Sequence, residues 1–232
     1  MRDAVGMSGL ALRLHAMSAS LFRLAPGLAT RAANAGQVAD YMRWQDETFA
    51  LRPELFTRRE LLWARLAEEL DPGRKLFVVE LGVAWGYATS QWLKILGARD
   101  FEWHGFDLFT GLPRAWRDLP AGHFDADGKP PAIDDERVFW HVGDTHETLP
   151  QLGLAEHRDS QWLVLFDLDL YEPTLAAWNL LQPFLEPGDL LYFDEAIDSD
   201  ERRVLDEQVL AETAVSPIGT TTNSLGLRVS GN

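Results

Sequence analysis

One stretch of the chain, Leu76 to Leu93 (LFVVELGVAWGYATSQWL), limits most strongly what this sequence can fold into. It opens with a run of six residues that is apolar apart from its acid, as in a parallel β-strand buried on both faces of a sheet. From Trp85 onward the apolar residues return at helical spacing. We therefore predict a strand, a tight loop and a helix, which is the repeating unit of an α/β domain.

The loop in this unit carries the pattern Glu80-Leu-Gly82-x-x-x-Gly86. Glycine at position 82 allows a sharp turn and a close approach of the backbone to a ligand. The helix that follows directs free N–H groups at whatever lies above the strand. A dinucleotide fingerprint would read G-x-G-x-x-G, but position 84 is Ala and an acid precedes the first glycine. The pattern predicts a cofactor-binding loop, and the alternative is a strand-to-helix turn without a ligand.

This E-x-G-x-x-x-G arrangement resembles motif I of class I S-adenosylmethionine-dependent methyltransferases. The resemblance implies a Rossmann-like α/β fold with a mostly parallel seven-stranded sheet and helices on both faces. It also implies that the loop holds the methionine part of the cofactor. The cofactor-binding residues expected in this loop are Glu80, Gly82 and Gly86.

Composition narrows the class of protein further. A chain of 232 residues suits one α/β domain with an appendage. The formal net charge of -15 argues against a nucleic-acid partner and favours a small substrate that is not strongly anionic. There is no cysteine, which excludes disulfides, thiolate catalysis and cysteine-ligated metals. The lack of cysteine is compatible with a reducing cytoplasm, which is the location we expect.

The N-terminal part differs from the acidic remainder because residues 1–36 carry four arginines and a single acid. We expect residues 1–56 to form a helical extension and residues 57–232 to form the methyltransferase domain. A secretory signal fits poorly, and no apolar run is long enough to span a membrane. Binding to an anionic membrane surface and docking on the acidic body or a partner subunit both remain open, and we favour docking, with a homo-oligomer contact or a lid as its role. The expected helix rests on an apolar stripe at helical spacing, and Pro26 should end it. The stripe consists of Leu10, Leu14, Met17, Leu21 and Leu24.

Two further features are expected to frame the domain. Thr57-Arg-Arg-Glu60 matches a capping box, which predicts a helix that begins at Thr57. The segment from Leu108 to Glu136 is rich in Gly and Pro and shows no period, so we expect a lid or binding loop. Its Trp116, His123 and Phe124 could close over an aromatic or sugar substrate, and His123 is an alternative candidate base.

Two acids are candidates for contact with the nucleoside part of the cofactor. Asp107 ends a predicted strand 21 residues after Gly86, close to the spacing at which nucleotide-binding α/β folds place an acid on the ribose hydroxyls. Asp144 follows the next predicted strand, and the resemblance implies a position near the adenine. The alternative for either acid is that it caps the turn or helix that follows it.

Four more acids follow two later predicted strands. Asp167 and Asp169 are two residues apart and should point to the same side of an extended chain. Asp194 and Glu195 end the next strand, and the carboxyl ends of neighbouring strands lie about 5 Å apart. Such a cluster suggests a hard divalent cation, with Mg²⁺ as the first choice. The alternative is that these acids only cap the following helices.

Three segments sharpen the resemblance: GFDLFTGLP (105–113), DLDLYEPT (167–174) and PGDLLYFDE (187–195). They resemble the macrocin O-methyltransferase family, which methylates sugar hydroxyls, and the likeness covers about residues 55–195. Carried over by position, it implies Asp167, Asp194 and Glu195 as metal ligands and Asp169 as the base. The family pair is usually Asp-Asp, so the role of Glu195 is in doubt.

We therefore expect an S-adenosylmethionine-dependent, Mg²⁺-dependent O-methyltransferase that acts on a hydroxyl of a small molecule, such as a sugar of a glycosylated natural product. One alternative keeps the fold but uses a catechol or another small-molecule acceptor. A second alternative is a protein that binds S-adenosylmethionine without catalysis.

Overall fold

The computed structural model describes residues 25–231, and the chain divides into two compact units, residues 1–44 and 45–232. The apolar stripe predicted between Leu10 and Leu24 lies outside the described residues. In the first unit the description covers helix α2 (Pro26–Thr48), which continues into the second unit. Pro26 begins this helix, because proline fits the first helical position, where no N–H donor is needed. The predicted domain boundary after residue 56 stays a prediction.

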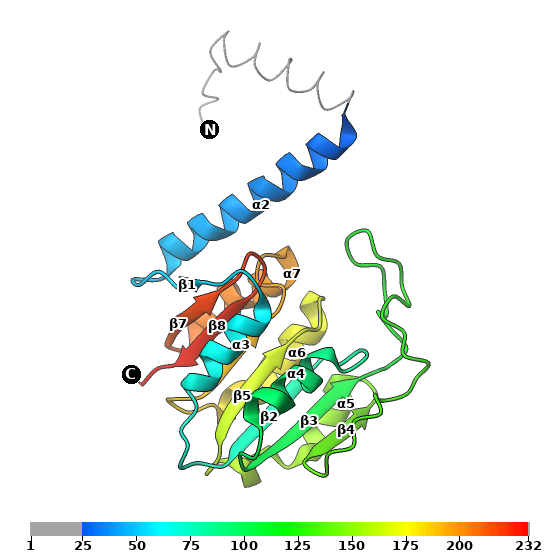
Figure 1. Cartoon of the computed structure of the whole chain (residues 1–232), viewed down its shortest axis with the longest axis vertical. Helices are drawn as coiled ribbons and strands as arrows, with labels where there is room; N and C mark the ends of the chain where they lie inside the picture. Colours follow the sequence, from blue (N-terminus) through cyan, green and yellow to red (C-terminus); the bar gives the residue numbers. More distant parts are fainter. Residues whose placement is uncertain (1–24, 232) are drawn as a thin grey trace. The chain divides into compact units, whose positions relative to one another are not determined.

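The second unit is built on one sheet with the strand order β1-β7-β8-β6-β5-β2-β3-β4 (Figure 1). Its centre is β2 (Leu76–Leu81), which pairs in parallel with β5 (Gln161–Phe166) and with β3 (Phe101–Asp107). All six residues of β2 and of β5 are buried. The predicted central strand therefore has the predicted bounds, and its apolar run reflects cover on both faces.

The remaining strands extend the sheet on both sides. β4 (Val138–Val142) pairs with β3, and β6 (Leu190–Phe193) pairs with β5, in parallel in both cases. β8 (Leu225–Val229) runs antiparallel to β6 and to β7 (Val215–Thr220). The sheet has eight strands instead of the predicted seven, because the two-residue strand β1 (Glu54–Leu55) adds to the edge at β7.

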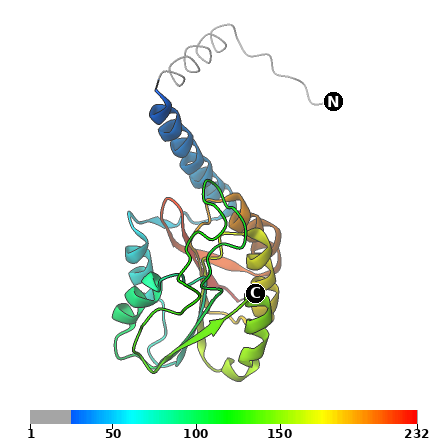
Figure 2. The same ribbon diagram turned by 90° about the vertical axis from the view of Figure 1, so that its right-hand side faces the viewer.

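Helices cover both faces of this sheet (Figure 2). The cyan and blue-green helices on one face are α3 (Arg59–Glu68) and α4 (Tyr87–Leu96). The other face carries α5 (Thr145–Thr148), α6 (Tyr171–Leu181) and α7 (Ser199–Val204). The described residues also form four short helical turns. Three are 3₁₀ turns, at Leu149–Leu152, Leu154–His157 and Gln182–Phe184; the fourth is a π-helical turn after α7, Leu205–Val209, which leads into α8 (Leu210–Glu212).

Tryptophan supplies much of the core beneath α3 and α4. Trp63 on α3 is 1% exposed, and its ring packs against Trp92 of α4 at 6.1 Å and against Tyr192 of β6 at 5.8 Å between centroids. Trp103 of β3 is fully buried in the same cluster. Large aromatic side chains bury much apolar area each, so this cluster fixes α3 against the sheet.

The start of α3 differs from the sequence prediction. The capping box at Thr57 is wrong, because the helix begins at Arg59 and its N-cap is Arg58, which makes no side-chain capping bond. The Glu60 carboxylate, which would have completed the box, accepts a hydrogen bond from the Tyr87 hydroxyl at 2.6 Å. As a result Arg59 stands at the first helical position, at the carboxyl side of the sheet.

The long segment between β3 and β4 contains no helix and no strand in the described chain, as predicted. It is held by its own bonds: the Phe109 carbonyl accepts from the N–H groups of Ala126 and Gly128 at 3.0 and 2.8 Å. A small apolar cluster of Leu112, Trp116 and Leu170 joins it to the chain after β5. The segment is the long green loop of Figure 1.

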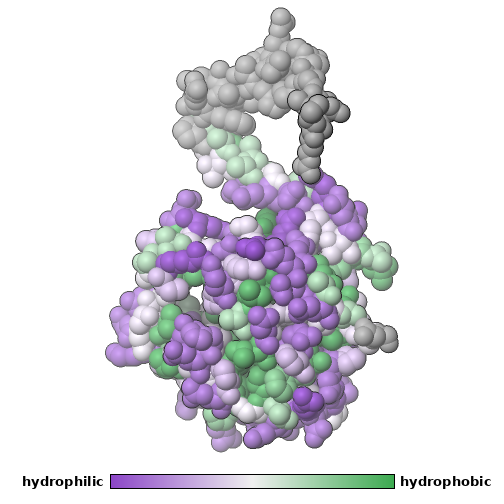
Figure 3. All heavy atoms as spheres, turned by 180° about the vertical axis from the view of Figure 1, so that it is seen from behind, coloured by the Kyte–Doolittle hydropathy of each residue, from purple (hydrophilic) through white to green (hydrophobic). Residues whose placement is uncertain are grey.

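Among the described residues, no helix combines the length and apolarity needed to cross a membrane. Figure 3 shows hydrophilic residues over much of the visible face of the second unit, with hydrophobic ones between them.

Candidate functional site

A cavity of about 350 Å³ lies at the carboxyl ends of β2, β3, β5 and β6. In open α/β sheets, ligands bind in this position, beyond the carboxyl ends of the strands. The loop after β2 forms one wall and the acids after β5 and β6 form another, while the long segment contributes Leu112, Trp116 and Phe124. The cavity therefore joins the two regions that the sequence singled out.

Gly82 is the tightest point of the loop after β2. Its φ is +87°, a conformation that side chains rarely adopt. A Cβ at this position would lie 1.9 Å from the carbonyl oxygen of Asp167, well inside contact distance. Glycine is therefore required here both by the backbone conformation and by the close approach of the chain after β5.

Asp107 braces this loop from the end of β3. Its Oδ2 accepts hydrogen bonds from the N–H groups of Val83 and Ala84 at 2.7 and 2.8 Å, and its Oδ1 accepts from the N–H of Phe109 at 2.7 Å. Asp107 also lines the cavity. The carboxylate thus combines a structural task with a position at which a ribose hydroxyl could reach it.

Glu80 and Gly86 do not belong to the cavity wall. Glu80 is 1% exposed, and its Oε2 accepts from the Thr89 hydroxyl at 2.6 Å and from the Trp103 indole N–H at 2.8 Å. Burial raises the pKa of Glu80 to about 8, although both hydrogen bonds oppose the rise. Gly86 has a φ of +76° and faces Pro131. The structure therefore places both residues behind the loop, as its support.

Asp144 caps a helix, which is the alternative role that the sequence left open for it, and it also lines the cavity. It is the N-cap of α5, where its Oδ1 accepts from the backbone N–H of His146 at 3.1 Å and lies 2.7 Å from the His146 ring Nδ1. A capping carboxylate still has acceptor capacity toward the cavity. His123, the alternative base, is not among the lining residues and contacts the ring of Phe124 at 4.4 Å between centroids.

The structure brings the four acids after β5 and β6 together at the cavity, and we call them the acid cluster. Its members all line the cavity: Asp167, Asp169, Asp194 and Glu195. The prediction rested on neighbouring strands, and β5 and β6 are neighbours. Asp169 has a φ of +62°, a strained conformation that tends to occur at functional sites.

Burial and the crowding of like charges together raise pKa values in this cluster. Burial, followed by Asp194 and Asp169, raises the pKa of Asp167 well above its ordinary value, and Arg59 opposes the rise. Burial, followed by Glu195 and Asp194, raises the pKa of Asp169 to about 7. Carboxylates in such surroundings favour protonation or a nearby cation.

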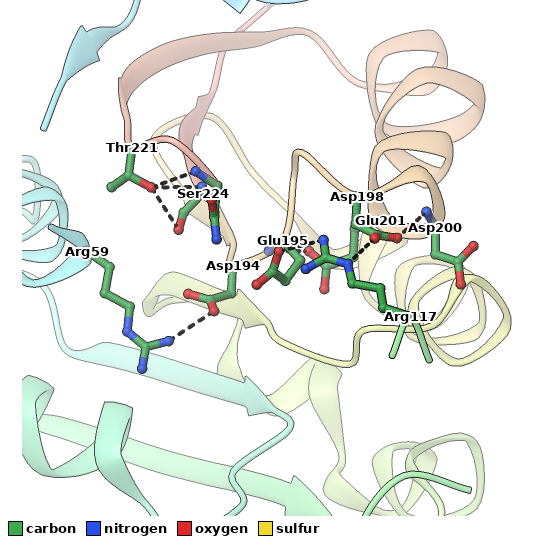
Figure 4. A network of polar contacts seen from close by, with 10 residues as sticks. Arg59, Arg117, Asp194, Glu195, Asp198, Asp200, Glu201, Thr221 and Ser224 are labelled. Atoms are coloured by element: carbon green, nitrogen blue, oxygen red, sulfur yellow. Dashed lines mark hydrogen bonds and ion pairs between the residues drawn. The ribbon is translucent and has the colours of Figure 1, made fainter. Parts of the chain in front are cut away.

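Two arginines supply positive charge to the cluster, and sequence reasoning missed both (Figure 4). Arg59 lines the cavity, and its Nη1 lies 3.0 Å from Oδ2 of Asp194. Arg117, from the long segment, donates to Glu195 at 3.0 Å and to Asp198 at 2.5 Å. In the sequence, Arg59 belongs to a segment that predicts only the start of a helix. For Arg117 the sequence offered one signal, an arginine pair at 114 and 117 in a loop otherwise rich in acids.

Two buried groups hold the turn that carries Asp194 and Glu195. The Tyr192 hydroxyl donates a hydrogen bond to Oδ1 of Asp194. Glu201 of α7 is fully buried, and its Oε2 accepts from the backbone N–H of Glu195 at 3.0 Å. Burial raises the pKa of Glu201 well above its ordinary value. These contacts fix the backbone of the acid pair relative to β6.

The acid cluster has the donor chemistry of a Mg²⁺ site, since carboxylate oxygens are the ligands that hard cations prefer. Its oxygens are not gathered as a ligand set, however: in the described part of the chain no group of three or more His, Cys, Asp or Glu residues is placed to hold a metal ion. Asp194 and Glu195 are each paired with an arginine instead.

No protein-family model and no curated protein matches the chain. Solved structures do match. The calicheamicin methyltransferase CalS11 aligns with a TM-score of 0.58 and 24% identity over 73% of this chain and 78% of CalS11. The O-methyltransferase NovP aligns with a TM-score of 0.56 and 19% identity over 75% of this chain and 80% of NovP. An apo structure of CalS11, described as a TDP-rhamnose 3'-O-methyltransferase, aligns with a TM-score of 0.52 and 23% identity over 73% of this chain and 78% of CalS11.

These neighbours confirm the resemblance that the sequence motifs predicted, at the level of the fold. The second unit shares the α/β fold of these methyltransferases, and its cavity lies at the carboxyl edge of the sheet. A shared fold does not fix an activity, which has to be argued from the site.

Proposed function

We propose that this chain is an S-adenosylmethionine-dependent O-methyltransferase that acts on a hydroxyl group of a small molecule. One observation carries the proposal: a single cavity joins the glycine loop after β2 to the acid cluster after β5 and β6. The fold shared with O-methyltransferases supports it. A site of this kind needs a place for the cofactor and a base that takes the proton of the substrate hydroxyl. The wall around Gly82 offers the first, and the acid cluster offers the second.

The wall around Gly82 suits the cofactor. Its backbone approaches the cavity without a side chain, and Asp107 and Asp144 face the same space with carboxylate oxygens. We assign Gly82 to the amino-acid part, Asp107 to the ribose and Asp144 to the adenine amine. Glu80 and Gly86 keep their place in the proposal as supports of the loop. The bound cofactor would supply a methyl group activated on a sulfonium.

The acid cluster suits the acceptor. An alcohol is a weak nucleophile at neutral pH, so a base within hydrogen-bond reach must take its proton as the new bond forms. We assign this role to Asp169, which lines the cavity and lies beside Asp167 and Asp194. Its strained backbone holds the carboxylate at a defined position, which favours alignment of the acceptor oxygen.

Metal dependence is a separate part of the proposal. Asp167, Asp194 and Glu195 would have to gather around a Mg²⁺ ion in order to hold it, because their oxygens are not arranged as a ligand set. Burial and the neighbouring carboxylates raise the pKa of Asp167, and a cation would stabilise its charged form. A bound ion would lower the pKa of the acceptor hydroxyl and stabilise the developing alkoxide. Arg59 and Arg117 already occupy two of the three carboxylates, so the ion would compete with both arginines.

The cavity wall also bears on the acceptor. Trp85, which is 60% exposed, lines it beside Phe124, with ring centroids 5.9 Å apart. Trp116 and Leu112 add apolar surface from the long segment. Aromatic faces bind the apolar faces of rings, so we propose a sugar hydroxyl of a glycosylated natural product as the acceptor.

The test is a screen of hydroxylated acceptors for methyl transfer from S-adenosylmethionine, with and without a divalent metal. Neutral glycosides should be methylated, while catechols test the alternative acceptor class. Calorimetry with S-adenosylmethionine accompanies the screen. Binding without transfer to any acceptor would favour a non-catalytic protein, and the absence of binding would overturn the proposed function.

A further inference from the structure

Arg59 occupies a distinctive place in the cavity. It is the first residue of α3, and its Nη1 reaches Oδ2 of Asp194 at 3.0 Å. The guanidinium lies against two aromatic rings, 5.3 Å from the centroid of Trp63 and 5.1 Å from that of Tyr87. Tyr87 is the first residue of α4 and directly follows the loop from Gly82 to Gly86. The rings therefore hold the cation beside the acid cluster, and Figure 4 shows it directed at Asp194.

The charges of the cavity wall are uneven. Among the described residues that line it, six are carboxylates, and Arg59 is the only lysine or arginine. S-adenosylmethionine carries two positive groups, the sulfonium and the ammonium, and one negative group, its carboxylate. The acidic wall suits the two cations, but it repels the carboxylate unless a cation lies beside it.

We propose that Arg59 binds the carboxylate of S-adenosylmethionine, an inference that rests on the proposed function. The bond to Asp194 uses Nη1, and a guanidinium has five N–H donors, so donors remain for a second carboxylate. Arginine suits this task because its planar fork matches carboxylate geometry and its flat face stacks on aromatic rings. Arg59 is thus a binding and positioning residue that sets the amino-acid end of the cofactor beside the Gly82 loop.

A purely structural role for Arg59 makes a different prediction. If the residue only neutralises Asp194, its loss should weaken every ligand of the site to a similar degree, whether or not the ligand has a carboxylate. If it binds the cofactor carboxylate, its loss should weaken only ligands that carry one. Decarboxylated S-adenosylmethionine lacks that single group and keeps the sulfonium, the amine and the nucleoside, so it separates the two roles.

The experiment measures the affinity of S-adenosylmethionine and of its decarboxylated form by calorimetry on the full chain. For Arg59→Gln we expect the affinity for S-adenosylmethionine to fall by about 10- to 100-fold, the usual effect of losing a hydrogen bond to a charged group. The affinity for the decarboxylated form should change by less than about 3-fold. Arg58→Gln, an exposed neighbour at the N-cap, is the matched control and should leave both affinities unchanged.

Arg59→Lys keeps the charge but loses the planar fork, so it should weaken S-adenosylmethionine by a smaller factor and spare the decarboxylated form. This variant decides the question if Arg59→Gln does not fold. Equal losses for both ligands in either variant would overturn the role of Arg59 while leaving the proposed function standing. A wild-type chain that binds neither ligand would instead overturn the proposed function itself.

Discussion

The Cα of Gly82 faces the carbonyl of Asp167 so closely that a Cβ on it would lie 1.9 Å from the carbonyl oxygen. Asp167 begins the acid cluster, and Gly82 lies in the loop that we assign to the cofactor. The two walls of the cavity are therefore in direct backbone contact, and a change at one must displace the other.

Gly82→Ala should accordingly disturb both walls. A positive φ alone costs a side chain about 1–3 kcal/mol, and the clash with a backbone carbonyl adds to this. We expect a loss of more than about 3 kcal/mol in the free energy of unfolding, measured by denaturant titration, or loss of S-adenosylmethionine binding. Gly97→Ala is the control, because Gly97 has a φ of +55° but nothing within 4 Å of its added Cβ. Equal effects of the two changes would show that strain, and not the contact with Asp167, explains the result.

Asp169→Asn tests the assigned base. The amide has the shape of the carboxylate but cannot take a proton, so kcat should fall by about 10²- to 10⁴-fold. Affinity for S-adenosylmethionine should stay close to that of the wild type. Asp118→Asn, a change at an exposed residue of the long segment, should leave kcat unchanged. A wild-type kcat in Asp169→Asn would remove Asp169 from the mechanism.

Asp167→Ala and Asp194→Ala test the metal. Each change removes a proposed ligand, so any stimulation of methyl transfer by Mg²⁺ should disappear, and Mg²⁺ binding measured by calorimetry should weaken. Asp144→Ala lines the same cavity outside the proposed ligand set and should keep the response to Mg²⁺. Full wild-type activity in the presence of a chelator would contradict metal dependence. Arg59 and Arg117 would then be the groups that balance the negative charge of the acid cluster.

Glu80 should make stability depend on pH. Its pKa is raised from 4.5 to about 8 in the folded chain, so the folded state binds the proton more tightly than the unfolded state. This contribution to stability is fully present below pH 4.5 and is lost as the pH rises through about 8. Glu80→Gln resembles the protonated acid in shape and should remove that dependence, so its free energy of unfolding should exceed that of the wild type increasingly from pH 5 to 8, by roughly a few kcal/mol at the upper end. Parallel pH profiles of the two proteins would show that Glu80 is ionised in the folded state.

The sequence was most informative where a local pattern and the sheet topology agree. The run from Leu76 to Leu81 became a central strand with the predicted bounds, because a strand covered on both faces is apolar except where buried partners satisfy a polar group, as they do for Glu80. The acid cluster was predictable for a related reason: residues that end neighbouring parallel strands meet at one edge.

Partners that are distant in the sequence were not predictable. Arg59 lies 135 positions from Asp194, and Arg117 lies 78 positions from Glu195. No local period marks such pairs, because they depend on how α3 and the long segment fold over the sheet edge. The bonds that bury Glu80 were also not predicted, because they depend on how the start of α4 and the strand β3 pack against β2.

The brace between Asp107 and the N–H groups of Val83 and Ala84 is made entirely by groups of the chain itself. A loop that is held by such internal bonds loses little chain entropy when a ligand binds. Under the proposed function, exchange of used for fresh cofactor would then require no rearrangement at that wall. Any movement that limits turnover is then expected on the opposite side, where Arg117 ties the long segment to Glu195 and Asp198.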